Sequence, residues 1–137
     1  MSADLTPVTG SPFDAIRITT PEGREYWSAR ELMPLLGYEK WERFTDAISR
    51  AKIAAHNSGY VVAEQFPGAG KLVQTGSGAQ RTIEDYHLSR YACYLIAMSG
   101  DPRKPEVAAA LTYFAIKTRE AETRPTPQPL QGADLMA

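Results

Sequence analysis

The residue types best suited to hydrolytic chemistry meet in one short segment, at Glu84, Asp85 and His87. Carboxylates beside a histidine can serve in acid–base catalysis or in a metal-dependent nuclease. The surrounding pattern predicts a β-strand, however, and adjacent residues of a strand face opposite sides of the sheet. Glu84 and Asp85 therefore cannot point into one site without a bulge. His56 lies in an unrelated context, and neither histidine has a nucleophile at a catalytic spacing. We expect structural or surface roles for these side chains and no enzyme activity, with a nuclease as the least favoured alternative.

A glycine-rich segment, residues 66–72 (FPGAGKL), partly matches a phosphate-binding loop because it contains a Gly-Lys pair. Such a loop needs a glycine five residues before that pair and a Ser or Thr after the lysine. Gln65 and Leu72 occupy those two positions, so nucleotide hydrolysis is not predicted. Two readings stay open: a flexible loop whose basic edge contacts phosphates, and an ordinary connection.

Metal and cofactor chemistry find little support in the composition. The chain has one cysteine, Cys93, and two histidines, which excludes an intramolecular disulfide and a Cys/His zinc site. Cys93 falls in an apolar helical pattern and should behave as a small buried hydrophobe. We expect no cofactor and no metal.

Basic residues are the remaining lead, although the net charge of the 137-residue chain is only −1. Any contact with DNA must therefore be local. On a predicted helix, Arg43 and Arg50 lie seven residues apart and share a face with Glu39 and Asp46. That face can contact phosphates, or it can be a solvated helix surface with i,i+4 ion pairs.

Four other cations have fewer acidic neighbours. Lys71 and Arg81 flank the glycine-rich tip of a predicted hairpin, and such a tip can follow a groove of DNA. Arg103 and Lys104 precede a helix whose first amides can bind a phosphate. We predict DNA contacts at all six cations.

The elements that position these residues follow from periodicity and turn signals. They predict an α+β fold: a single small domain in which two β-hairpins form a small antiparallel sheet packed on four helices. Ser28 and Ser89 are expected to cap helices. The expected strands are residues 14–19, 24–27, 71–74 and 81–86, and the expected helices are residues 29–36, 39–57, 90–99 and 104–122.

Both ends of the chain lack such periodicity. Residues 1–12 are predicted to be a disordered leader, residues 13–122 the folded domain, and residues 123–137, with three alternating prolines, a Pro-rich disordered tail or linker. The sequence contains neither a signal-peptide pattern nor an apolar run of the length that a membrane span needs. We expect a cytoplasmic location.

Longer blocks of sequence resemble the BRO N-terminal domain of phage antirepressors, and especially the branch represented by bacterial DNA-damage-inducible protein D. The resemblance covers about residues 11–122. Its main blocks are residues 25–32 (EYWSAREL), 35–38 (LLGY), 41–44 (WERF), 66–71 (FPGAGK), 88–97 (LSRYACYLIA) and 100–110 (GDPRKPEVAAA). In that branch a second, C-terminal region usually follows the position of the Pro-rich tail.

The resemblance implies a DNA-associated regulator of phage or bacterial origin, acting in antirepression or in the SOS response to DNA damage. One hypothesis is direct DNA binding through the basic hairpin and turn. The alternative is a protein–protein effector that binds a repressor or a recombinase filament without contacting DNA. For that alternative, Tyr113 and Ile116 lie off the apolar stripe of the last helix and could form the interface, which is also compatible with a homodimer.

Overall fold

A computed structural model describes residues 11–76 and 78–123 of the chain. Within these residues the elements confirm the predicted α+β class. In chain order they are α1 (Pro12–Ile16), β1 (Ile18–Thr19), β2 (Glu25–Ser28), α2 (Ala29–Leu35), α3 (Trp41–Asn57), α4 (Val62–Gln65), β3 (Gly68–Gln74), β4 (Gln80–Leu88), α5 (Arg90–Met98) and α6 (Pro105–Thr123).

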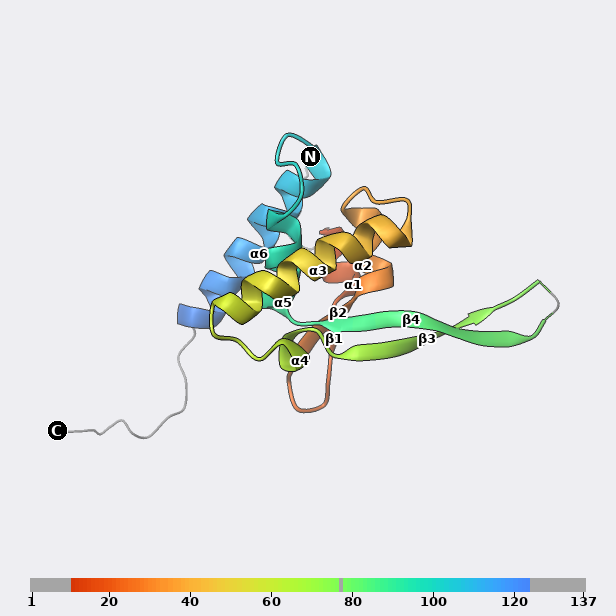
Figure 1. Cartoon of the computed structure of the whole chain (residues 1–137). Helices are drawn as coiled ribbons and strands as arrows, with labels where there is room; N and C mark the ends of the chain where they lie inside the picture. The colour runs from red at the N-terminus through yellow and green to blue at the C-terminus, as the bar shows by residue number, and fades with distance from the viewer. Residues whose placement is uncertain (1–10, 77, 124–137) are drawn as a thin grey trace, which may run out of the picture.

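The strands form one antiparallel sheet in the order β1-β2-β4-β3. Its centre is short, because β2 pairs with β4 only through Trp27 with Leu88 and Ser28 with His87. Strands β3 and β4 pair over their full length, from Gly68 opposite Tyr86 to Gln74 opposite Gln80. Figure 1 shows this hairpin, which we call the arm, reaching well beyond the helices.

The core lies between the base of the sheet and the longer helices. Its centre contains Trp27 of β2, Phe44 of α3 and Phe114 of α6, all with no exposed surface. Helix α5 packs between α3 and α6 and buries Ile96 and the predicted buried Cys93. Burial raises the pKa of the Cys93 thiol well above its usual value, which keeps it protonated.

Side-chain caps set the starts of two helices as predicted. Ser28 Oγ accepts a hydrogen bond from the backbone N–H of Glu31 at the start of α2. Ser89 Oγ accepts one from Ala92 at the start of α5, at 3.0 Å. These caps satisfy amides that have no partner within the helix.

The prediction of a strand over residues 14–19 is wrong over most of its length. The segment begins with α1, in which Ser11 is the N-cap and Pro12 occupies the first turn, and only Ile18 and Thr19 form a strand. The buried Phe13 explains the difference, because its ring packs against Phe114 and its carbonyl accepts a hydrogen bond from Trp27 Nε1. Local β-propensity is a weak preference that such tertiary contacts override.

Helices α1 and α4 add to the four that the periodicity predicted. The predicted leader and tail lie mostly outside the described residues. None of the helices that the structure describes combines the length and apolar character needed to cross a membrane.

Candidate nucleic-acid interface

The arm carries two of the predicted DNA-contacting residues on one face. Paired residues of an antiparallel ladder share a face, and Lys71 lies opposite Ile83 while Arg81 lies opposite Val73. Lys71 and Arg81 are therefore diagonal neighbours on the same side of the ribbon. The described residues between 71 and 83 include no Asp or Glu, so the outer half of the arm is cationic.

The two arm cations differ in their present partners. Lys71 Nζ lies 2.9 Å from Glu31 Oε2 of α2, and this hydrogen bond raises the pKa of Lys71. Arg81 is exposed and forms no ion pair within the described part of the chain. Exposed ion pairs contribute about 0–1 kcal/mol, so a phosphate can compete for Lys71 at little cost.

A buried carboxylate anchors the base of the arm to α2. Asp85 of β4 is 3% exposed, and its two oxygens accept hydrogen bonds from Ser28 Oγ at 2.6 Å and from the backbone N–H of Arg30 at 2.9 Å. Hydrogen bonds to a charged acceptor are stronger than neutral ones. Asp85 therefore fixes the direction in which the arm leaves the body.

The opposite face of the arm is tied to α3 by Glu84. Its Oε1 accepts a hydrogen bond from Trp41 Nε1 at 3.0 Å, and its backbone carbonyl accepts one from Arg30 Nε at 2.7 Å. The guanidinium of Arg30 lies 3.7 Å from the centre of the Trp41 ring, a cation–π contact. Arg30 thus joins α2, α3 and β4 at one point.

Glu84, Asp85 and His87 do not converge into a catalytic site. Glu84 and Asp85 face opposite sides, as the strand pattern predicted, and His87 stacks on Tyr26 with ring centroids 4.2 Å apart. Over residues 11–76 and 78–123, no three His, Cys, Asp or Glu side chains are grouped closely enough to hold a metal ion. Each of the three side chains has a structural contact instead.

The α3 cations lie on the outer surface of that helix. Arg43 and Arg50 are exposed, whereas Phe44, Ala47, Ile48 and Ala51 form the buried face. The ion pairs Glu39–Arg43 and Asp46–Arg50, which the solvated-surface alternative requires, do not form within the described residues, so both guanidinium groups are accessible.

The Arg103–Lys104 turn connects α5 to α6. Asp101 binds the Arg103 guanidinium at 2.9 Å, which lowers the pKa of Asp101 and raises that of Arg103. Lys104 is exposed, and its carbonyl accepts a hydrogen bond from Ala108 at the start of α6. In Figure 1 this turn lies far from the tip of the arm, so the six predicted cations form separate groups and not one patch.

The predicted partner-binding residues differ in exposure. Ile116 is 52% exposed on the outside of α6. Tyr113 is half-buried, because its ring packs against Phe13 and its hydroxyl donates a hydrogen bond to Asp14 Oδ1 at 2.6 Å. Together with Ala109 they border a largely apolar hollow beside α1, so this face remains a predicted protein interface.

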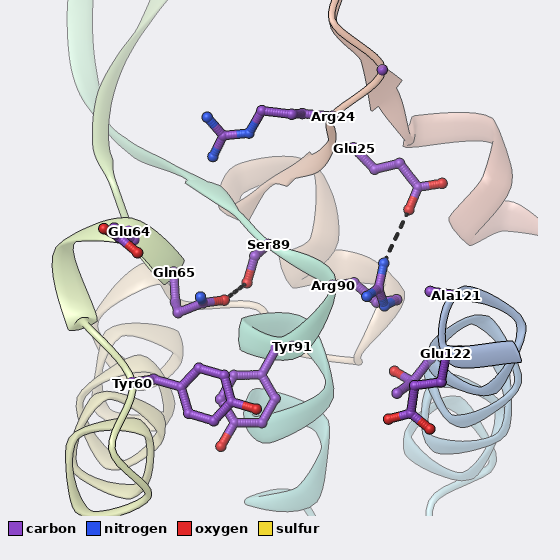
Figure 2. Close-up of a pocket in the computed structure, with 12 residues that line it drawn as sticks. Arg24, Glu25, Tyr60, Glu64, Gln65, Ser89, Arg90, Tyr91, Ala121 and Glu122 are labelled. Atoms are coloured by element: carbon purple, nitrogen blue, oxygen red, sulfur yellow. Dashed lines mark hydrogen bonds and ion pairs between the residues drawn. The ribbon is translucent and has the colours of Figure 1, made fainter. Parts of the chain in front are cut away.

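A hollow of about 830 Å³ beside β2 and α5 contains none of the predicted site residues. Figure 2 shows Arg24 and Arg90 around it, together with the acids Glu25, Glu64 and Glu122. Arg90 Nη1 lies 3.5 Å from Glu25 Oε1. Because the lining acids outnumber the lining cations, this hollow does not favour a phosphate.

Sequence reasoning missed the contacts that orient the arm. The sequence offered Asp85 as a catalytic candidate and Trp41 as part of an apolar helix stripe, and it gave Arg30 no role beyond the family resemblance. A buried position for Asp85 could have been inferred from strand alternation, because Asp85 lies on the same face of the strand as the apolar residue Ile83, two positions earlier. Its partners could not, because Ser28 lies 57 residues away in the chain.

Comparison with known proteins gives two findings. The family model described as "BRO family, N-terminal domain" matches residues 15–116. The chain is also 47% identical over 111 residues to DNA damage-inducible protein D of Escherichia coli (strain K12), an alignment that covers 81% of this chain and 40% of that protein. The chain thus spans well under half the length of this relative. No solved structure matches the chain.

Proposed function

The chain belongs to the family of the BRO N-terminal domain, and on that premise we propose that it is a non-catalytic regulatory module that contacts DNA through the arm. The relative's name, DNA damage-inducible protein D, favours a role in the response to DNA damage, and antirepression is the other regulatory role that the family suggests. The observation that carries the DNA proposal is the protruding ribbon with Lys71 and Arg81 on one face.

The dimensions of the arm suit a groove of DNA. A two-stranded ribbon fits the major groove of B-DNA, which is about 12 Å wide. Lys71 and Arg81 would neutralise phosphates, while Gln74 and Gln80, paired with each other on the opposite face, offer amides that can bind base edges. Arg43 and Arg50 of α3 would add phosphate contacts from the body.

A salt-dependent DNA titration tests this proposal. We expect fluorescence anisotropy to show binding to duplex or single-stranded DNA that weakens steeply between two salt concentrations. Each phosphate contact contributes about 0.9 to the slope of log K against log salt, so Lys71→Ala/Arg81→Ala should reduce that slope by about 2. Arg119→Ala removes an exposed cation of α6 and is the matched control, for which we expect an unchanged slope.

The second candidate is a protein–protein effector that binds a repressor or a recombinase. It is favoured by the near-neutral charge of the chain, and by the carboxylates that already pair with Lys71 and Arg103. Its interface would be the exposed face of α6 around Ile116. If the wild-type chain, which retains Lys71 and Arg81, bound no DNA at tens of micromolar protein, the first proposal would be refuted and this one would remain.

A further inference from the structure

Strand β3 is an edge strand whose outer side is open. It is the last strand in the order β1-β2-β4-β3. The backbone bonds at the two ends of the arm, Thr75 N to Ala79 O and His87 N to Pro67 O, show that the odd-numbered residues of this strand bond to β4. The N–H and C=O groups of the even-numbered residues therefore point outward. These residues are Gly68, Gly70, Leu72 and Gln74, and all four are exposed.

We propose that this edge pairs antiparallel with the β3 edge of a second copy of the chain, with Lys71 at the twofold axis. In this register Gly68 faces Gln74 of the other copy and Gly70 faces Leu72. All four outward residues of each copy then have a partner, whereas a twofold axis at Gly70 or Leu72 leaves one of them unpaired. The pairing would form about eight hydrogen bonds, two for each bonded residue pair.

The side chains on one face of the ribbon fit this register. Leu72 on the outer part of the strand is 61% exposed, so a partner strand can bury apolar surface there. A Cβ atom at Gly70 would lie 2.5 Å from Thr82 Cγ2, so the Thr82 methyl group leans over the glycine. Leu72 of the second copy, placed opposite Gly70, would cover that methyl group and lose much of its exposure.

On the other face the register places the two Lys71 residues opposite each other. Like charges at such a position normally disfavour pairing. Here each ammonium group is bound by Glu31 of its own chain at 2.9 Å, which offsets the repulsion. A lysine in an edge strand usually protects against pairing, and in this chain Glu31 reduces that protection.

A disulfide test distinguishes this register from other contacts. Opposite residues of a non-hydrogen-bonded pair have Cα atoms about 4.5 Å apart, within the range of a disulfide. Lys71→Cys should therefore form a covalent dimer under mild oxidation. In Val73→Cys, the matched control, the two new thiols lie roughly 13 Å apart because each is displaced two residues from the axis. The native Cys93 is buried and does not compete. Equal cross-linking of the two variants would overturn the register.

Sedimentation velocity tests the dimer without cross-linking. The interface is small, so we expect a shift from 15.1 kDa towards twice that mass as the protein concentration rises through the micromolar range. Leu72→Pro removes one outward N–H that the dimer needs, so this variant should stay monomeric at every concentration. It should still fold, because proline is tolerated on the free side of an edge strand. Circular dichroism checks that this variant is folded.

Other outcomes identify other surfaces. A wild-type chain that stays monomeric up to several hundred micromolar would overturn the proposal. So would a dimer that persists in folded Leu72→Pro and is lost in Ile116→Ser, which would assign self-association to α6. The dimer makes the arm four-stranded, so it is a separate state from the two-stranded ribbon that we propose for the DNA groove. Since neither measurement includes DNA, their results are independent of the DNA titration.

Discussion

Removing the buried carboxylate of Asp85 should loosen the base of the arm and destabilise the whole domain. In Asp85→Ala, the hydroxyl of Ser28 and the backbone N–H of Arg30 lose their acceptor. Ser28 is 5% exposed, so water can replace the carboxylate only in part. The change therefore leaves polar groups unsatisfied near the core.

The expected loss can be worked from these two bonds. A hydrogen bond to a charged group contributes about 1.5–3 kcal/mol, and the partly exposed Arg30 amide recovers some of its share from water. We expect the free energy of unfolding to fall by about 3 kcal/mol, which corresponds to about 12 °C in Tm for a domain of this size. Asp85→Asn keeps one acceptor oxygen and should cost about 1 kcal/mol.

Urea unfolding followed by circular dichroism measures these changes, and a double-mutant cycle with Ser28→Ala isolates the Ser28–Asp85 bond. We expect a coupling free energy of about 1.5 kcal/mol. If Asp85→Ala lost less than about 0.5 kcal/mol, or if the two substitutions were additive, the anchoring role of Asp85 would be wrong.

Three further predictions concern single residues. The partial burial of Tyr113 and its hydrogen bond to the Asp14 carboxylate raise the pKa of its hydroxyl, so the neutral form stabilises the fold below about pH 10. This contribution is lost as the pH rises further, and Tyr113→Phe should show less alkaline loss of Tm. Gly37→Ala should cost about 1–2 kcal/mol in urea unfolding, because φ is +82° and the new Cβ would lie 3.1 Å from Glu106 Oε2. Gly23→Ala, with φ +89° and no atom within 4 Å, should cost less. Cys93 should react with a thiol reagent only after unfolding, and a fast reaction of the native protein would contradict its burial.

The sequence predicted the elements whose signals are local. The serine caps, the long apolar stripe of α3 and the glycine-rich hairpin each depend on residues close together in the chain, and each lies near its expected place. The helix over Pro12–Ile16 was missed because Phe13 gains its stability from Phe114 and Trp27, which are distant in sequence. Short segments with such contacts do not follow their own propensity.

The candidate site was predicted as a set of residue types and not as an arrangement. Lys71 and Arg81 share a face because of strand register, which the hairpin signal alone did not fix. The partner of Lys71 is Glu31, 40 residues earlier, and no local pattern connects them. Asp101 and Arg103, in contrast, are two residues apart, so the turn sequence alone could have suggested their ion pair.

The base of the arm is held more firmly than the part towards its tip. At its base, Asp85 and Glu84 are bound to α2 and α3, whereas towards the tip the structure shows mainly the ladder between β3 and β4. The amide hydrogens of Val73 and Arg81, which are bonded in the ladder, should therefore exchange with solvent through local opening, at rates far above those near Asp85. The outer part of the arm can therefore adjust its shape to a surface, while the base of the arm keeps its direction.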